Sequence, residues 1–492
     1  MKTKNLISTI LLFAAILCSV SCGEDSAQTD VSKTETQAAE TTAEAVTEEA
    51  LYKADYLPDA DYNGYVLKTV TVPEFPVAMA AEDGDVINDS IYKRNRIISE
   101  RYNMDFEDIS VPTYMDMTNT FKTSALAASN DFDLGRLIMR DAFSLAQEGF
   151  ILPVSELPYA DITQDWYIHY VNDELTINDK LYFAYSDECI SAFTSTICVI
   201  FNQQIVADLD LTSPYTLVDE GKWTYEAFFE MAGEARADLD NDGKYSMAAD
   251  RLGICSIYDE MLPSMWISAG IKVVEKEDGI PVFTAPGNEK LIGLLENVYA
   301  YWMADGMCYD AFITKGHDEI YRTESRAQYT EGHALFMVMS FGGLDALRDM
   351  KDDFGLVPTP KYDEAQNEYY GRLIDGWINV PLYCCENPER TSVIMEALAV
   401  ESKNYVIPAV YENAIQNKYL RDEESIRMLD MVMKNRVIDL GDTVWMFDIR
   451  NVFMDVFTKK SGNFSSAIAK NIKKIDRVIT KAVEQLTNAG MT

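Results

Sequence analysis

The run GYVLKTVTV (residues 64–72) opens the stretch that decides the fold, because its alternating apolar and β-branched residues predict a strand. The next run, VINDSIYKRNRIISERYN (86–103), has apolar residues at helical spacing and predicts a helix. MDFEDISV (104–111) predicts a second strand, residues 113–128 a second helix, and DFDLGRLI (131–138) a third strand. This alternation predicts an α/β lobe with a mostly parallel sheet.

The rest of the chain predicts a second lobe and a helical C-terminal part. With 492 residues, of which 48% are hydrophobic, the chain is too long for one compact core and long enough for two. The apolar strand pattern TSTICVIFN (194–202) carries the chain toward the second lobe. From about Met395 onward, helical patterns dominate.

The charge balance excludes some classes of partner. Asp and Glu number 80 against 42 Lys and Arg, which gives a net charge of −38. Nucleic acid and anionic membrane surfaces both require clustered basic residues, so neither is an expected partner. Uncharged and cationic ligands stay open.

The N-terminus predicts export. Lys2 and Lys4 precede an apolar run at residues 6–20 that is too short for a comfortable membrane span. The following SVSC resembles a bacterial lipobox, with Ser19 where Leu is usual. We therefore expect residues 1–21 to be a lipoprotein signal peptide and Cys22 to be lipidated, with an ordinary signal peptide as the alternative.

Residues 22–55 predict a tether. The segment is rich in Ser, Thr, Ala and Glu, and its composition buries too little apolar surface to fold. A lipid anchor joined to such a tether would hold the protein at the outer face of the bacterial cell membrane.

The cysteines and histidines give little sign of a zinc site. The six cysteines of the body form no CxxC pair, and the chain has three histidines in all. Buried free thiols are the preferred interpretation, although export permits disulfides. The six are Cys189, Cys198, Cys255, Cys308, Cys384 and Cys385.

Several stretches together resemble the extracellular solute-binding lipoproteins of carbohydrate-type bacterial ABC importers. They occur in the family's order behind the lipobox and tether, and they cover nearly all of the chain after Tyr56. They include GDVINDSIYKRNRIISERYNMDFE, NDELTINDKLYFAYSD, SPYTLVDEGKWTYEAFFEMA, YTEGHALFMV and FGLVPTPKYDEAQNEYY.

The resemblance implies a type II periplasmic-binding fold, in which two α/β lobes close on a ligand. The first lobe would comprise residues 56–192 and 328–394. The second would comprise residues 193–327 and 395–492, including the C-terminal helices. It also implies a monomer without catalytic activity that hands its ligand to the permease subunits of an importer.

A sugar ligand sets the requirements for the site. Its apolar ring faces stack on aromatic side chains, and its hydroxyls need Asp, Glu, Asn or Arg partners. The candidates follow strands or resemble positions that face the family's cleft, and Trp445 with Arg450 resembles a stacking site. Each tryptophan has core packing as its alternative. Arg140 and Asp141 have a mutual pair or a helix cap as theirs, and Trp166, Trp223 and Trp302 are expected in the core. The candidates are Arg140, Asp141, Asp187, Glu188, Trp266, Phe341, Asp375, Trp377, Trp445 and Arg450.

The stretch ADLDNDGKYSMAAD (237–250) resembles the front half of an EF-hand calcium loop. Position 12, which normally carries a bidentate acid, is Ala249, and Asp250 follows it. A structural Ca2+ is one interpretation and a cation-free Asx-rich turn is the other. The resemblance implies a structural loop rather than a sensor. The candidate ligands are Asp238, Asp240, Asp242, Lys244 and Asp250.

Two other functions are compatible with an exported acidic chain. A secreted carbohydrate-active hydrolase needs two carboxylates across a cleft, and 80 acids always offer a pair. A surface adhesion lipoprotein needs only a binding face. Substrate binding for an importer is the preferred interpretation.

Overall fold

The computed structural model describes residues 51–79, 81–309, 321–416 and 420–489. From Leu51 onward the chain forms one compact unit. The predicted signal peptide, the lipidation at Cys22 and the tether up to residue 50 lie outside the described residues. Residues 51–55, which we expected in the tether, belong instead to the compact unit, because Ala54 is buried and Tyr52 is hydrogen-bonded to Asn404.

The first sheet has the strand order β12-β3-β1-β2. β1 (Tyr65–Thr71) pairs in parallel with β2 (Met104–Ser110) and β3 (Leu134–Ile138), and β12 (Trp377–Pro381) runs antiparallel to β3. The predicted order of strands and helices is confirmed.

The two helices of this stretch begin at capped residues. Asp85 accepts hydrogen bonds from the backbone N–H groups of Ile87 and Asn88 at the start of α1 (Val86–Tyr102). Thr113 caps α2 (Tyr114–Ala127) in the same way. Such caps satisfy backbone donors that a helix start leaves free.

The second sheet has the strand order β10-β4-β9-β5-β8. Its strands are β4 (Ile197–Asn202), β5 (Leu252–Cys255), β8 (Cys308–Tyr309), β9 (Ala334–Ser340) and β10 (Phe354–Val357).

The lobe boundaries differ from those that we expected. β9 and β10, which fall in the predicted first-lobe segment 328–394, both pair antiparallel with β4 of the second sheet. Conversely, α13 (Pro388–Glu401) runs past residue 395 and packs on the first sheet, where Val393 and Leu398 share a cluster with Leu67. The apolar pattern of these segments predicts that they are buried, but it does not predict which of the two sheets buries them.

The chain passes between the two sheets through short, packed segments. One lies after α5 (Ile190–Thr194), directly before β4. Another is residues 374–376, where the Ile374 N–H donates to the Ser195 carbonyl and the Gly376 carbonyl accepts from Met139. A Cβ at Gly376 would lie 2.5 Å from the Tyr185 ring, so the two segments require glycine there.

A third passage begins at a single π-helical turn, η3 (Ser402–Val406), between α13 and α14 (Ile407–Gln416). Pro408 lacks the N–H that would close an α-helical bond onto the Asn404 carbonyl, which explains the widened turn. Beyond α14, α15 (Glu423–Lys434) packs against β10 of the second sheet.

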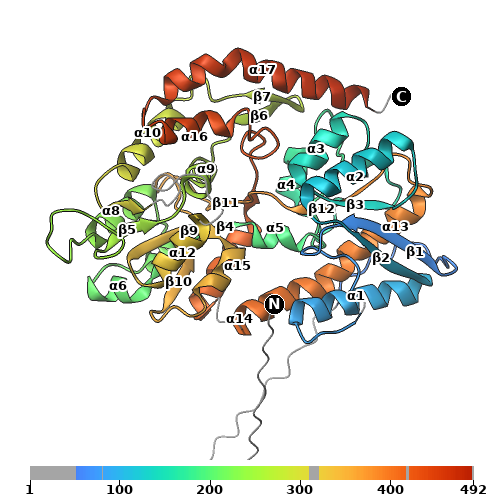
Figure 1. Cartoon of the computed structure of the whole chain (residues 1–492), viewed down its shortest axis with the longest axis horizontal. Coiled ribbons are helices and arrows are strands. Elements are labelled where there is room, and N and C mark those ends of the chain that lie inside the picture. Colours follow the sequence, from blue (N-terminus) through green and yellow to red (C-terminus); the bar gives the residue numbers. More distant parts are fainter. Residues whose placement is uncertain (1–50, 80, 310–320, 417–419, 490–492) are drawn as a thin grey trace, which may run out of the picture. The chain divides into compact units, whose positions relative to one another are not determined.

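The C-terminal helices α16 (Arg450–Thr458) and α17 (Phe464–Asn488) complete the unit. α17 contacts β7 (Ile280–Phe283) and α10 (Glu289–Trp302), and its end reaches α3 (Met139–Gln147). Figure 1 shows α17 in red above the hairpin of β6 (Val274–Glu277) and β7, ending beside α3.

The remaining elements connect these parts. No helix among the described residues is long and apolar enough to cross a membrane. Cys189, Cys198, Cys384 and Cys385 are free thiols, as preferred from the sequence. The further elements are η1 (Val154–Glu156), α4 (His169–Leu175), α6 (Gln203–Asp208), α7 (Pro214–Asp219), α8 (Tyr225–Ala235), α9 (Tyr258–Ser268), β6 (Val274–Glu277), α12 (Tyr321–Thr330), η2 (Phe341–Leu347), β11 (Gly371–Arg372) and β13 (Arg436–Val437).

Candidate functional site

One edge of the first sheet collects several of the predicted residues. The carboxyl ends of the parallel strands β1, β2 and β3 meet there, together with the start of the antiparallel β12. Loops at this edge of an α/β sheet are the usual place for ligands. Phe75 follows β1, Tyr114 follows β2, Arg140 follows β3, and Asp375 and Trp377 lie at the start of β12.

Arg140, Asp141 and Asp375 form a polar cluster at this edge. Arg140 Nη1 donates to Asp375 Oδ2 at 3.2 Å, and Arg140 Nε lies 3.7 Å from Asp141 Oδ1. The Thr118 hydroxyl donates to Asp141 Oδ2 at 2.9 Å. The three charged side chains are 22–23% exposed, so they are held in place and still open to solvent. The sequence left a mutual pair of Arg140 and Asp141 as the alternative to ligand binding. The two side chains do form this pair, and both stay partly exposed.

Asp375 also caps α3 from a distance. The residue before α3, Ile138, has no capping side chain, and Asp375 Oδ1 accepts from the Met139 N–H at 3.1 Å and the Gly376 N–H at 2.8 Å. Burial raises the pKa of Asp375 to about 6, against the opposing effects of Arg140 and the two backbone donors. The nearby Asp141 carboxylate raises it further.

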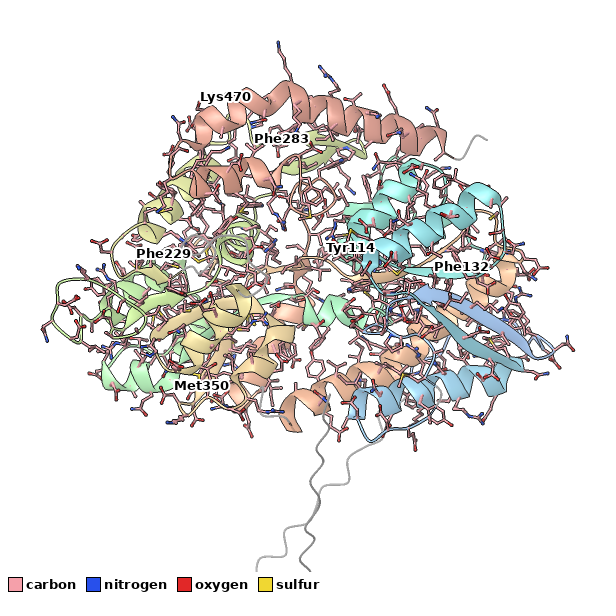
Figure 2. All side chains as sticks on the ribbon, in the orientation of Figure 1. Tyr114, Phe132, Phe229, Phe283, Met350 and Lys470 are labelled. Atoms are coloured by element: carbon pink, nitrogen blue, oxygen red, sulfur yellow. The ribbon has the colours of Figure 1, made fainter. Side chains whose placement is uncertain are left out.

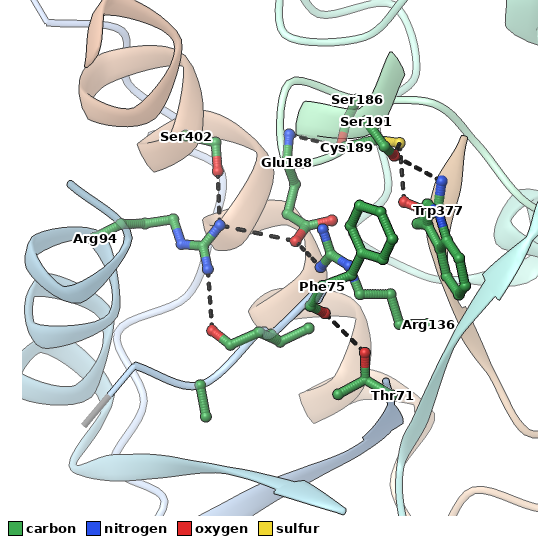
Figure 3. A network of polar contacts seen from close by, with 12 residues as sticks. Thr71, Phe75, Arg94, Arg136, Ser186, Glu188, Cys189, Ser191, Trp377 and Ser402 are labelled. Carbon is green, nitrogen blue, oxygen red and sulfur yellow. Dashed lines mark hydrogen bonds and ion pairs between the residues drawn. The ribbon is translucent and has the colours of Figure 1, made fainter. Parts of the chain in front are cut away.

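Aromatic side chains flank the polar cluster. Phe75 and Trp377 stack with ring centroids 4.4 Å apart and are half-buried, and Figure 3 shows the pair side by side. On the other side, the Arg140 guanidinium lies 5.6 Å from the Tyr114 ring, which is 40% exposed at the start of α2 (Figure 2). Sequence reasoning missed Phe75, Tyr114 and Thr118. Phe75 and Tyr114 lie in or next to the loops that follow β1 and β2, which is the signal that would have found them, whereas Thr118 lies within α2 and has no such signal.

Trp445 lies in the core against α3, and Arg450 is mostly buried beside an ion pair. Trp445 is 4% exposed and packs edge-on against Phe143, with ring centroids 5.4 Å apart. Arg450 Nη1 lies 3.7 Å from Asp442, which is fully buried. Burial lowers the pKa of Arg450, and Asp442 and Asp375 are among the acids that oppose this shift.

The Asp442 carboxylate itself is held by Arg372. The guanidinium donates from Nε at 2.7 Å and from Nη2 at 2.9 Å, and neither side chain reaches solvent. Arg450 therefore borders a buried ion pair, close to the polar cluster but not part of its hydrogen bonds.

Two further candidates lie inside the core. Trp266 is fully buried, and its Nε1 donates to Asp439 at 3.0 Å. Phe341 is 5% exposed and packs edge-on against Phe193. The structure does not bring either of them to the polar cluster. Trp166, Trp223 and Trp302 are buried, as expected.

Glu188 belongs to a buried ion network with Arg136 of β3 and Arg94 of α1 (Figure 3), and the neighbouring Asp187 is buried as well. Glu188 Oε1 lies 2.5 Å from Arg136 Nη1 and 3.7 Å from Arg94 Nη1. Asp187 Oδ2 lies 3.2 Å from Lys403 Nζ. These carboxylates are occupied by cationic side chains of the fold, so their geometry is that of a structural brace.

The Asp-rich loop gathers part of the predicted ligand set. The backbones of Ala237 and Arg251 pair at its base. Asp238, Asp240 and Asp250 each place a carboxylate oxygen so that all three lie within 4.8 Å of one another. Hard cations such as Ca2+ take such oxygen donors, so these residues fit a divalent cation.

The other two predicted ligands fall outside that group. The Asp242 carboxylate accepts the Lys244 N–H at 2.8 Å, and Lys244 is exposed. Asp250 supplies the third acid despite being one place late. It accepts from Ser246 and Leu239, whose backbone N–H groups hold the pKa of its carboxyl below the usual value.

Comparisons with known proteins support the fold. No family model matches the chain, and no curated protein matches it closely. Among solved structures, a sugar transporter from Rhizobium etli in an open conformation is similar at 13% identity, with a TM-score of 0.58 over 86% of this chain and 99% of that one. The maltose-binding periplasmic protein of Listeria monocytogenes in complex with maltose is similar at 12% identity, with a TM-score of 0.55 over 86% and 98%.

A third similar structure is the GacH receptor of Streptomyces glaucescens, solved without ligand and with acarbose. It matches at 11% identity, with a TM-score of 0.55 over 85% of this chain and 99% of that one. The three matches span 85–86% of this chain and 98–99% of each relative. The chain has the two-lobe α/β fold of periplasmic binding proteins.

Proposed function

We propose that the protein is the substrate-binding subunit of an ABC importer and captures an extracellular sugar or oligosaccharide by closure of its two lobes. The observation that carries the proposal is the partly exposed cluster of Arg140, Asp141 and Asp375 between aromatic rings, at the crossing of residues 374–376. Closure about short crossings is the usual way in which such folds enclose a ligand.

The chemistry of the cluster suits a neutral polyhydroxyl ligand. Arg140 offers guanidinium donors, and the two carboxylates offer acceptors that are already held by Thr118, Met139 and Gly376. Hydroxyl groups of a sugar donate and accept at once, so they match such a mixed set. The exposed Tyr114 ring offers a face for the apolar side of a sugar ring.

Partners and location extend the same proposal. Cys22 would carry the lipid, residues 22–50 would form the tether, and the permease subunits would receive the ligand at the outer face of the membrane. The similar structures include binding proteins whose descriptions name maltose and acarbose, and this supports a carbohydrate ligand without identifying the sugar. We propose binding without catalysis.

A thermal-shift and calorimetric screen tests the proposal. The purified protein is titrated with maltose, maltotetraose and other oligosaccharides, and with peptides as the competing class. We expect one or more carbohydrates to raise the midpoint of unfolding and to bind without any release of reducing ends. Stabilisation by peptides alone would show that the ligand class is wrong, and release of reducing ends would point to a hydrolase.

The site itself is tested with a matched pair of tyrosine variants. Tyr114→Ala should weaken carbohydrate binding by roughly 5- to 150-fold, because a lost aromatic contact costs about 1–3 kcal/mol. Tyr170→Ala removes a ring that is 61% exposed on α4 and should leave binding unchanged. Equal affinities for the two variants would place the ligand elsewhere.

A further inference from the structure

The first described residues of the chain are fastened to a helix. The Tyr52 N–H donates to Asn404 Oδ1 at 2.8 Å, and Asn404 Nδ2 donates to the Tyr52 carbonyl at 3.1 Å. The Asn404 amide thus satisfies both backbone groups of Tyr52, as the backbone of a neighbouring strand would. The Lys403 ammonium also lies 5.5 Å from the Tyr52 ring.

Two apolar residues of this segment are buried against α13. Ala54 and Leu57 are 4% and 5% exposed and share a hydrophobic cluster with Ala397. The Tyr56 hydroxyl donates to the buried carboxylate of Glu396. Residues 51–57, which we call the N-terminal strap, are therefore an ordered part of the folded unit.

The helix that holds the strap is the beginning of a passage between the sheets. Asn404 and Lys403 lie in the π-helical turn η3, which leads from α13 toward α14 and α15. π-helical turns are weak points of helical hydrogen bonding and often mark functional positions. In α14, Tyr411 packs edge-on against Phe193 of α5, at the neighbouring passage.

Side chains of η3 connect it to that neighbouring passage. Lys403 Nζ lies 3.2 Å from Asp187, and the Ser402 hydroxyl accepts from Arg94 at 3.1 Å. Arg94 in turn faces Glu188 (Figure 3). Contacts therefore run without interruption from the strap, through η3, to residues 187 and 188 just before α5.

We propose that the N-terminal strap stiffens the crossing at η3 and so couples the point where the tether joins the protein to closure of the lobes. The inference rests on the proposed function, because it requires a ligand that closes the lobes. Without the strap, η3 would be more mobile in the ligand-free protein. Closure of the lobes on a ligand would then have to restrict this motion. Ordering costs conformational entropy, so ligand affinity would fall although the strap lies outside the polar cluster.

Hydrogen exchange on the ligand-free, full-length protein gives the primary test. Asn404→Ala removes both hydrogen bonds to Tyr52, and deletion of residues 51–57 removes the strap. We expect amide exchange in residues 401–411 to become at least threefold faster in both variants. Asn297→Ala makes the same change on an exposed face of α10 and should leave this exchange as in the wild type. Unchanged exchange at 401–411 in both strap variants would overturn the proposal.

The coupling to ligand is tested with maltotetraose as the probe. We expect the dissociation constant of Asn404→Ala to rise about 2- to 10-fold, with that of Asn297→Ala unchanged. Faster exchange together with an unchanged dissociation constant would overturn the coupling. If maltotetraose and the other carbohydrates fail to bind the wild type, the proposed function fails, whereas the exchange measurement still decides whether the strap stiffens η3.

Discussion

At the scale of single residues, Asp375 combines an exposed acceptor with a structural role. Its carboxylate receives Arg140 on one oxygen and two backbone N–H groups on the other, and burial still raises its pKa from 3.8 to about 6. Between pH 3.8 and pH 6, this carboxyl is therefore protonated more often in the folded protein than in the unfolded chain. Its contribution to stability is therefore greatest at low pH and is lost as pH rises toward 6.

We expect Asp375→Asn to reveal this dependence. The unfolding free energy of the wild type, relative to that of the variant, should fall by on the order of 2 kcal/mol between pH 4 and pH 7. Urea unfolding at pH 4, 5, 6 and 7 measures the difference. Asp349→Asn, at a side chain that is 90% exposed, should show no such trend. A constant difference between wild type and Asp375→Asn would mean that this carboxyl titrates normally.

Local sequence could place some site residues and not others. Arg140 and Asp141 follow a strand, so their position at the sheet edge could be predicted from the pattern. The burial of Trp266 depends on Asp439, 173 residues away, and that of Trp445 on Phe143. Such long-range packing leaves no local trace, which is why aromatic residues alone were poor guides to the site.

At the scale of elements, the Asp-rich loop makes a sharp prediction about which acids bind a cation. The EF-hand pattern assigns Asp238, Asp240 and Asp242, whereas the structure groups Asp238 and Asp240 with Asp250. We propose a structural Ca2+ at this second set. Saturating Ca2+ should then raise the midpoint of thermal unfolding, since a ligand at about 100 times its Kd stabilises by about 2.7 kcal/mol.

The loop variants separate the two assignments. Asp240→Asn should weaken Ca2+ binding at least tenfold in calorimetric titration, and Asp242→Asn should weaken it much less. The reverse order would support the EF-hand set. If EDTA and Ca2+ leave the unfolding midpoint unchanged, the loop is the cation-free turn that the sequence left open.

Elements as such were easier to predict than their pairing. The helices α1 and α2 begin directly after Asp85 and Thr113, whose side chains cap the helix starts. β9 has the apolar pattern of a buried strand, yet which sheet buries it depends on the match of Phe336 with Phe201 across 135 positions of sequence. The sheet order therefore had to come from the structure.

At the scale of the whole molecule, α17 contacts both α3, which packs on the first sheet, and α16 and α10, which pack on α9 beside the second. Its first part packs against α16 and α10, and near its end the Tyr182 hydroxyl donates to the Leu486 carbonyl. The segment of the β6–β7 hairpin makes a second set of contacts with residues 174–178. Lys272 pairs with Glu174, and the Asn178 N–H donates to the Gly279 carbonyl at 3.1 Å. Any movement of the lobes must therefore slide or break one of these contacts.

Leu486→Ala tests whether α17 holds the first lobe. Leu486 is 3% exposed, so truncation should lower the free energy of unfolding by about 2–4 kcal/mol, the usual cost of a buried Leu→Ala change. Leu126→Ala, at a side chain that is 68% exposed, should change it by less than about 0.5 kcal/mol. If α17 fastens the first lobe, hydrogen exchange in residues 177–183 should accelerate in the first variant only. Acceleration confined to α17 itself would mean that its end rests on the first lobe without restraining it, and lobe closure would then be governed by the crossings alone.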